Sequence, residues 1–182
     1  MPHSGRALID PIRIFSKVGL TKGMKVSDMG CGRTGHFVFS AARIVGETGI
    51  VYAVDILKDV LNAINSRIRT QALNNIQVIW SDIEAVNKTP IPPKSLDMCF
   101  FMNVISGVKN KQAALTESVR LLKEDGQIVI VDWSKKLATL GPSDDGLVDP
   151  KKLIEVATTC GLKLVQNILV SDYHYCLIFK KI

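Results

Sequence analysis

Long apolar runs are missing from this sequence. No stretch approaches the roughly 20 apolar residues that a membrane-spanning helix needs, and the first six residues lack the apolar core of a secretory signal. Cysteine is sparse as well. No C-x-x-C pair occurs among Cys31, Cys99, Cys160 and Cys176, so neither a zinc site nor a redox motif is indicated. These absences predict a cytoplasmic protein without a metal site.

Aromatic residues make up only 6% of the chain, and the basic residues form no stripe although the net charge is +6. Lysines occur singly or in separated pairs, without the interleaved aromatic side chains that are typical of RNA-binding surfaces. A solvated basic surface is therefore favoured, and RNA remains the weaker alternative as a partner. The length of 182 residues predicts a single globular domain.

The chain is organised around a glycine-rich turn between two apolar segments. Residues 24–29 are a short apolar segment that ends in a turn at Gly30, Gly32 and Gly35. Apolar residues at helical spacing follow, and a second apolar segment ends at Asp55. This order of strand, turn, helix, strand and acid is the nucleotide-binding half of a doubly wound sheet. Free N–H groups at the start of the helix would favour polar or anionic parts of a ligand.

Three acids are predicted at the ends of three successive strands. Asp28 stands two residues before the first glycine, where a carboxylate would repel a pyrophosphate but attract an ammonium group. Asp55 lies where a carboxylate can accept both hydroxyls of a ribose. Asp82 follows the third apolar segment and could accept from an adenine amino group, or it could cap a short helix at residues 83–86. Together the three acids predict a ligand that carries a cation, a ribose and an adenine, and S-adenosylmethionine has all three.

The first 23 residues precede this core and are predicted to form an N-terminal helical segment. Pro11 can begin a helix with Asp10 as its cap. Residues 24–182 then form the domain itself. The segment could act as a lid through His3, Ser4 and Arg6, or it could be a frayed terminus.

The rest of the chain predicts an α/β fold with a doubly wound, seven-stranded and mostly parallel sheet. Asp125-Gly126 is expected to turn the chain into a fifth strand at residues 127–131. The last two strands, at residues 162–170 and 173–180, are separated by only two residues. A connection this tight requires the last strand to be antiparallel to its neighbour.

Five blocks of the sequence, in order, resemble the motifs of the class I S-adenosylmethionine-dependent methyltransferases of the type 11 or UbiE-like subgroup. They are Asp28-Met-Gly-Cys-Gly, the segment 51–55, Ser81-Asp82-Ile83, the segment 96–103 and the segment 121–126. The commonest turn of the family is one residue shorter between the last two glycines. The resemblance implies binding of S-adenosylmethionine and release of S-adenosylhomocysteine. The implied cofactor-binding residues are Asp28, Gly30, Cys31, Gly32, Gly35, Asp55, Ile56, Asp82, Ile83 and Asn103.

Asn103 follows the fourth predicted strand directly, at the edge where ligands bind in open α/β sheets. In methyltransferases that act on amino groups of DNA or protein amides, the asparagine at this position is followed by Pro-Pro-Tyr. Here Val104 and Ile105 follow instead, so a small-molecule acceptor is favoured. Asn103, Trp133 and His174 are the candidates for the acceptor side of the site, and no catalytic residue is assigned among them. His174 could act as an acid or base, or it could have only a structural role at the edge of the sheet. The polar segment 134–149 is expected to border the same site.

Two other functions fit parts of the sequence. The glycine spacing is compatible with an NAD-dependent oxidoreductase, but Asp28, the final hairpin and the absence of a Tyr-x-x-x-Lys pair disfavour it. An RNA-modification protein or a non-catalytic binding protein with the same fold is the second alternative. The sequence carries no signal for an oligomeric state.

Overall fold

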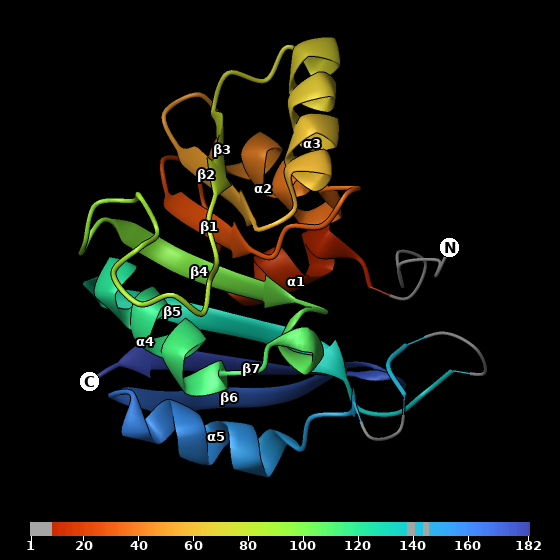
Figure 1. Cartoon of the computed structure of the whole chain (residues 1–182), viewed down its shortest axis with the longest axis vertical. Coiled ribbons are helices and arrows are strands. Elements are labelled where there is room, and N and C mark those ends of the chain that lie inside the picture. Colours follow the sequence, from red (N-terminus) through yellow and green to blue (C-terminus); the bar gives the residue numbers. More distant parts are fainter. Residues whose placement is uncertain (1–8, 138–140, 144–145) are drawn as a thin grey trace.

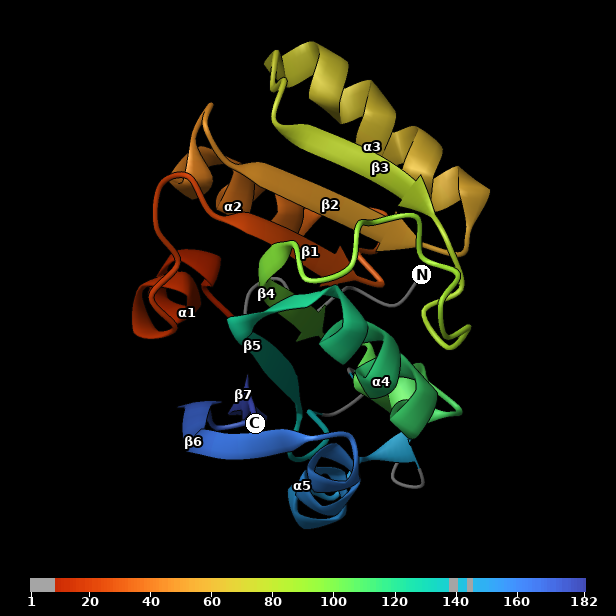
Figure 2. The same cartoon turned by 90° about the vertical axis from the view of Figure 1, so that its left-hand side faces the viewer.

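The computed structural model describes residues 9–137, 141–143 and 146–182. Its centre is one seven-stranded sheet in the order β3-β2-β1-β4-β5-β7-β6, which runs from top to bottom in Figure 2 (see also Figure 1). Strand β7 is antiparallel to both β5 and β6, while the other pairs are parallel. The predicted seven-stranded sheet with an antiparallel last strand is confirmed. The strands are β1 Lys25–Met29, β2 Ile50–Asp55, β3 Ile76–Trp80, β4 Leu96–Met102, β5 Leu122–Trp133, β6 Leu162–Ser171 and β7 His174–Lys181.

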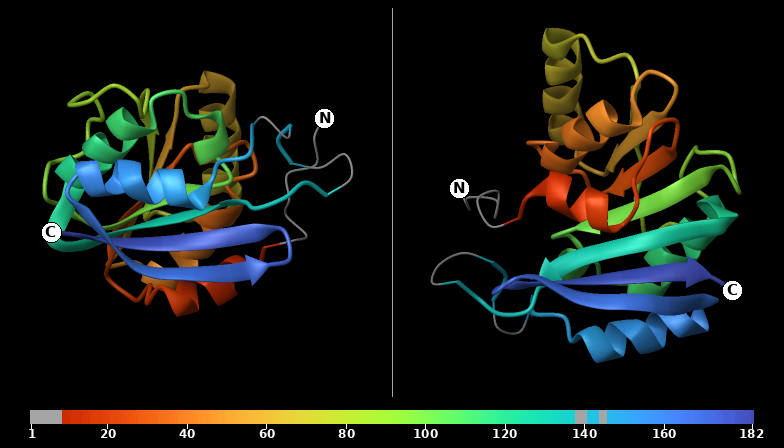
Figure 3. Two further views of the ribbon diagram at one scale, coloured as in Figure 1. Left: turned by 90° about the horizontal axis from the view of Figure 1, so that it is seen from below. Right: turned by 180° about the vertical axis from the view of Figure 1, so that it is seen from behind.

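Helices cover both faces of the sheet because its central strands are apolar on both sides. On β4, Phe100 and Met102 contribute to one buried cluster, with α1, α2 and α3. Cys99 and Phe101 contribute to a second cluster, with α4 and α5. Figure 3 shows α1 and α2 on the opposite side of the sheet from α4 and α5. The helices are α1 Pro11–Lys17, α2 His36–Val45, α3 Lys58–Gln71, α4 Lys111–Leu121 and α5 Pro150–Thr159, with a 3-10 turn η1 at Ile105–Gly107.

Helix α1 begins where the sequence predicts. The side chain of Asp10 accepts a hydrogen bond from the backbone N–H of Ile12 (2.9 Å), which satisfies one of the free donors of the first turn. The helix is held in the core by Phe15, whose ring packs against Phe37 and Phe100 at centroid distances of 6.0 and 5.1 Å. The lid candidates His3, Ser4 and Arg6 lie outside the described residues.

Strand β5 begins five residues earlier than predicted. Leu96 of β4 pairs with Leu122, but Met98 already pairs with Gln127. Two residues of β4 therefore face five of β5, and the Asp125-Gly126 region is a bulge inside the strand rather than a turn before it. The register between the two strands decides this, and the local sequence shows only the turn residues.

A buried glutamate fixes the irregular segment between β3 and β4. Glu117 of α4 accepts hydrogen bonds from the backbone N–H groups of Asn87 (2.7 Å) and Thr89 (2.9 Å). It also forms an ion pair with Arg120 (2.7 Å), whose guanidinium donates to the Thr89 carbonyl (3.0 Å). The proline-rich segment gains from α4 the hydrogen bonds that it cannot make within a helix or sheet. No helix in the described part of the chain has the length and apolarity to cross a membrane.

Candidate functional site

The glycine turn connects the carboxyl end of β1 to α2, and its N–H groups are bonded within the protein. The N–H groups of Gly30 and Cys31 both donate to the carbonyl of Val54, at 2.9 and 3.0 Å. The N–H of Gly32 donates to Oδ2 of Asp55 (3.1 Å). These three N–H groups therefore tie the turn to the end of β2. They precede α2, so they do not bear on the N–H groups predicted to be free at the start of that helix.

Asp28 has the least satisfied carboxylate at this edge of the sheet. Its side chain is 2% exposed and its Oδ1 is buried without a hydrogen-bond partner. Burial, followed by the nearby charge of Asp55, raises the pKa of Asp28 to about 7. A buried carboxylate of this kind is stabilised by a cation, and the predicted contact with an ammonium group is compatible with this environment.

Asp55 connects two parts of the site. Its Oδ2 accepts from Gly32 in the turn, and its Oδ1 accepts from the N–H of Leu57 (3.0 Å) at the start of α3. A carboxylate offers about four acceptor positions, so each oxygen keeps capacity for one further donor. The predicted contact with a ribose is compatible with this geometry, and the two backbone hydrogen bonds set the direction of the carboxylate.

Asp82 is exposed and stabilises a turn at the end of β3. Its Oδ1 accepts from the N–H of Glu84 (2.9 Å), and its carbonyl accepts from Ala85 (3.2 Å). Residues 83–86 form this turn and no helix, so the alternative of a helix cap is wrong. Ile56 is 53% exposed, and Ile83 is half-buried. The structure thus leaves the two isoleucines that follow Asp55 and Asp82 partly open to solvent.

Asn103 has an unusual backbone conformation directly after β4. Its φ is +55°, in the left-handed region that few non-glycine residues adopt. Its N–H donates to the carbonyl of Val131 (2.8 Å), while its side-chain Oδ1 is buried without a partner. The following residue, Val104, comes so close to the turn that a Cβ on Gly30 would lie 2.5 Å from its Cγ2. The missing side chain of Gly30 therefore allows the Asn103 loop to pack against the glycine turn.

Trp133 and His174 meet where β5 ends and β7 begins. They are paired across the two strands, and their ring centroids are 4.2 Å apart. His174 Nδ1 lies 3.0 Å from the hydroxyl of Ser171, and its Nε2 is buried without a partner. Burial lowers the pKa of His174 to about 4, so its ring is neutral at pH 7. Gly141 packs on the Trp133 ring, where an added Cβ would lie 3.1 Å from the ring carbons.

The sequence analysis does not mark Asp132 or Tyr175 as site residues. The two pair across β5 and β7 next to Trp133 and His174, and their side chains lie on the opposite face of the sheet. Asp132 accepts from the N–H of Ser106 in η1 (3.0 Å) and thereby fixes the loop that follows Asn103. The hydroxyl of Tyr175 is buried without a partner, and burial, Asp132 and Asp149 raise its pKa. No sequence motif marks either residue, because their position depends on the pairing of β5 with β7.

Three of the four cysteines are buried. Burial raises the pKa of Cys31, Cys99 and Cys176. Among the residues that the structure describes, no group of three His, Cys, Asp or Glu side chains could hold a metal ion.

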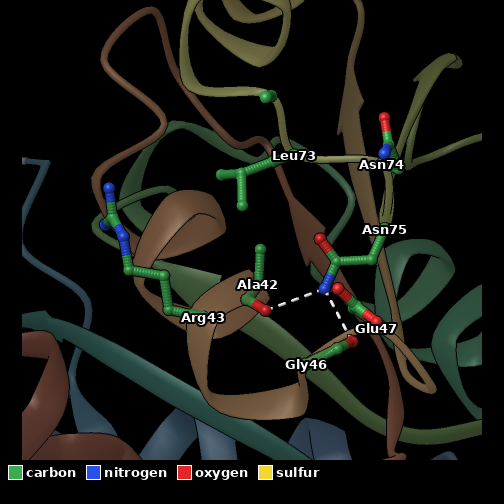
Figure 4. A pocket seen from close by; sticks show the side chains of 8 residues that line it. Ala42, Arg43, Gly46, Glu47, Leu73, Asn74 and Asn75 are labelled. Atoms are coloured by element: carbon green, nitrogen blue, oxygen red, sulfur yellow. Dashed lines mark hydrogen bonds between the residues drawn. The ribbon is translucent and has the colours of Figure 1, made fainter.

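A separate hollow of about 560 Å³ lies at the opposite, amino-terminal edge of the sheet (Figure 4). The end of α2 and the connection from α3 to β3 line it. There the amide of Asn75 donates to the carbonyls of Ala42 (2.7 Å) and Gly46 (2.8 Å), as the dashed lines show. These bonds satisfy carbonyl groups at the end of α2. Asn75 therefore has a structural role, and none of the predicted site residues lines this hollow.

Comparison with known proteins agrees with the sheet topology. A family model described as a methyltransferase domain matches residues 20–170. The chain belongs to the class I S-adenosylmethionine-dependent methyltransferases. The ubiquinone/menaquinone biosynthesis C-methyltransferase UbiE of Shewanella pealeana is 32% identical over 122 residues, which are 66% of this chain and 47% of that protein. The match thus spans about half the length of this relative.

Solved structures show the same fold. An S-adenosylmethionine-dependent methyltransferase from Aquifex aeolicus superposes with a TM-score of 0.90 at 23% identity, covering 100% of this chain and 95% of that one. Geranyl diphosphate C-methyltransferase from Streptomyces coelicolor gives a TM-score of 0.77 at 12% identity, covering 94% and 78%. These likenesses confirm the predicted methyltransferase fold.

Two glycines of the methyltransferase turn should respond differently to substitution. Gly35→Ala would place a Cβ 2.5 Å from Cδ1 of Ile64 and 2.9 Å from the Phe39 ring, at a φ of +51°. We expect it to lower the free energy of unfolding by about 2 kcal/mol. A Cβ on Gly32 would meet nothing within 4 Å, so Gly32→Ala, at a φ of +64°, should cost only about 1 kcal/mol. Urea unfolding of both variants tests this, and equal losses would contradict the packing role of Gly35.

Proposed function

We propose that this chain binds S-adenosylmethionine at the carboxyl edge of β1, β2, β3 and β4 and transfers its methyl group to a small molecule. The observation that carries the proposal is the buried Asp28 carboxylate, whose Oδ1 has no partner in the protein. An ammonium group of the cofactor's methionine part supplies both the positive charge and the hydrogen-bond donors that this oxygen lacks. A dinucleotide would instead bring a pyrophosphate to the same place.

The other residues at this edge match the remaining parts of the cofactor. Asp55 keeps free acceptor capacity for the ribose hydroxyls, and its two backbone hydrogen bonds hold the carboxylate in one orientation. Ile56 and Ile83 offer apolar contact to the adenine, with Asp82 as acceptor for its amino group. The open space at the Cβ position of Gly32 lets the ligand approach the backbone.

The cofactor supplies an activated methyl group on a sulfonium, so the protein has to orient the acceptor and exclude water. Asn103, Trp133 and His174 lie along the ends of β4, β5 and β7, next to the proposed cofactor site. Asn103 Oδ1 can accept a hydrogen bond from a ligand, and the Trp133 ring offers an apolar surface. A neutral His174 can hydrogen-bond the acceptor through Nε2, but its ring is not protonated at pH 7 and so cannot act as an imidazolium acid.

We further propose that the acceptor atom is a carbon. The sequence relatives are named C-methyltransferases of ubiquinone and menaquinone biosynthesis, and about two thirds of this chain aligns with them. The asparagine after β4 is followed by Val104 and Ile105, without the proline and tyrosine of amino-methylating enzymes. A small-molecule acceptor accordingly remains the proposal, and no contact in the described residues favours RNA.

Calorimetric titration of the purified protein with S-adenosylmethionine, S-adenosylhomocysteine and NAD tests the proposal. We expect micromolar binding of the first two ligands and none of NAD. Binding of NAD, or of none of the three, would overturn it. Incubation of the protein with radiolabelled S-adenosylmethionine and quinol precursors then tests whether a carbon acceptor is methylated.

The affinity for the cofactor should depend on pH through Asp28. Because its pKa is raised to about 7, Asp28 is largely protonated at pH 6, and a proton then competes with the cofactor's ammonium group. We expect the dissociation constant of S-adenosylhomocysteine to rise about fivefold from pH 7 to pH 6 and about tenfold from pH 8 to pH 6, and to be flat above pH 8. Titrations between pH 5.5 and 8.5 measure this.

The matched control is Asp28→Asn, which removes the titrating group and keeps the shape of the side chain. It should bind more weakly than the wild type at pH 8 and show no such pH dependence. A wild-type affinity that is constant over this range would show that Asp28 does not hold the ammonium group.

A further inference from the structure

The short connection from β2 to α3 would carry two of the proposed cofactor contacts, Asp55 and Ile56. Several hydrogen bonds hold it. The Asp55 carbonyl accepts from the N–H of Ser81 (3.1 Å), and its carboxylate accepts from the N–H of Leu57 (3.0 Å). The Ile56 carbonyl accepts from the indole N–H of Trp80 (2.9 Å). Trp80 is therefore the side chain that fixes the carbonyl group of Ile56.

Trp80 has an unusual position for a tryptophan. It is the last residue of β3, and it is 60% exposed, so burial in the core does not explain its ring. The ammonium group of Lys58, in the first turn of α3, lies 5.1 Å from the ring centroid. A cation over an indole face holds the ring in place. The ring is thus restrained on one side by Lys58, while its N–H reaches the connection that precedes α3.

We propose that Trp80 is a positioning residue for the nucleoside end of the cofactor. The inference rests on the proposed function, because it assumes that Asp55 and Ile56 hold the ribose and the adenine. The indole N–H fixes the carbonyl of the peptide group between Ile56 and Leu57, and the N–H of the same peptide group donates to the Asp55 carboxylate (3.0 Å). Trp80 thereby sets the height of the Ile56 side chain relative to the Asp55 carboxylate. Trp80 acts through Ile56, and its own ring lies on the α3 side of β3 and makes no contact with the reacting atoms.

Trp80→Phe tests the proposal because it keeps an aromatic ring beside Lys58 and removes the N–H donor. Binding is measured with S-adenosylhomocysteine and with 5′-methylthioadenosine, which has the same nucleoside but no amino acid part. We expect the dissociation constants of both ligands to rise by the same factor, about threefold to tenfold for one lost hydrogen bond. In a methyl-transfer assay, KM for S-adenosylmethionine should rise by this factor while kcat stays unchanged.

Three control variants separate this role from others. Asp28→Asn should weaken S-adenosylhomocysteine and leave 5′-methylthioadenosine unaffected, because it acts at the amino acid end. Lys58→Met removes the cation and keeps the hydrogen bond, so it should have a smaller effect than Trp80→Phe. Gln71→Ala removes an exposed hydrogen bond with Arg43 (2.8 Å) at the other end of α3 and should leave both affinities unchanged.

The possible failures are distinguishable. If the wild type binds both ligands and Trp80→Phe binds them within twofold as well, Trp80 has no positioning role. If Trp80→Phe weakens only S-adenosylhomocysteine, the effect is not at the nucleoside end and the proposal is wrong. If the wild type binds neither ligand, the proposed function itself fails. The circular dichroism spectrum and Tm of each variant show whether it is folded at the temperature of the titration.

Discussion

The Asp55→Ala variant is expected to bind S-adenosylhomocysteine at least about 100-fold more weakly than the wild type. The loss has two physical causes. The carboxylate is the proposed acceptor for two ribose hydroxyls, and a hydrogen bond to a charged group contributes about 1.5–3 kcal/mol. In addition, Oδ2 and Oδ1 hold the N–H groups of Gly32 and Leu57, so the substitution releases the glycine turn and the start of α3 together.

Calorimetric titration measures this effect, and Asp59→Ala is its matched control. Asp59 lies in the first turn of α3 and is exposed. Its removal changes the net charge equally and breaks no hydrogen bond of the turn. We expect Asp59→Ala to bind within about twofold of the wild type. An Asp55→Ala protein that is folded and binds as tightly as the control would show that the cofactor does not lie at the end of β2.

The sequence predicts the strands, the turn and the helix from β1 to β2 well because their signals are local. A glycine turn, an apolar strand and an acid follow one another within about thirty residues, and each adopts the predicted structure. The antiparallel last strand is equally predictable, since the short connection before residue 174 permits only a hairpin. These features depend on residues that are close together in the chain, so the sequence alone predicts them.

The sequence does not predict features that depend on distant neighbours. The bulge in β5 follows from its register with β4. Asn103 adopts its positive φ where the next residue, Val104, packs against Gly30 of the turn. The hydrogen bond from Gly32 to Asp55 joins residues that are 23 positions apart. Glu117 reads as an ordinary charged residue on a helix, yet it is fully buried. Its backbone partners, Asn87 and Thr89, precede it in the chain by 30 and 28 residues.

The substitution Glu117→Gln is expected to cost about 3 kcal/mol of the free energy of unfolding. The carboxylate of Glu117 accepts from two backbone N–H groups and from Arg120. A glutamine has one acceptor oxygen, and its NH2 group would face a donor at the other position. Buried N–H groups and a guanidinium then lose their partner, which is one of the more costly changes in a protein interior. For a chain of this length the loss corresponds to a fall in Tm of about 6–12 °C.

The dependence of this effect on pH follows from the pKa of Glu117. Burial alone would raise it, but the hydrogen bonds from Arg120, Asn87 and Thr89 outweigh burial and lower it to about 2. Since the pKa in the folded state lies below the ordinary value of 4.5, the ionised carboxylate stabilises the protein above pH 4.5. That contribution disappears as the pH falls toward 2. The difference between wild type and Glu117→Gln should thus be constant from pH 5 to 7 and shrink below pH 4.5.

Chemical unfolding of both proteins between pH 3 and 7 measures this difference, with Glu124→Gln as the matched control. Glu124 is exposed and pairs with Lys94 (2.8 Å) and Lys181 (3.4 Å) on the surface, where water screens the ion pairs. Its substitution should change the stability far less than that of Glu117 at every pH. Equal losses in the two variants would show that the segment from β3 to β4 does not depend on the buried carboxylate. A loss confined to Glu117→Gln would instead mean that one side chain of α4 holds the connection that follows Asp82, and with it the proposed adenine contacts.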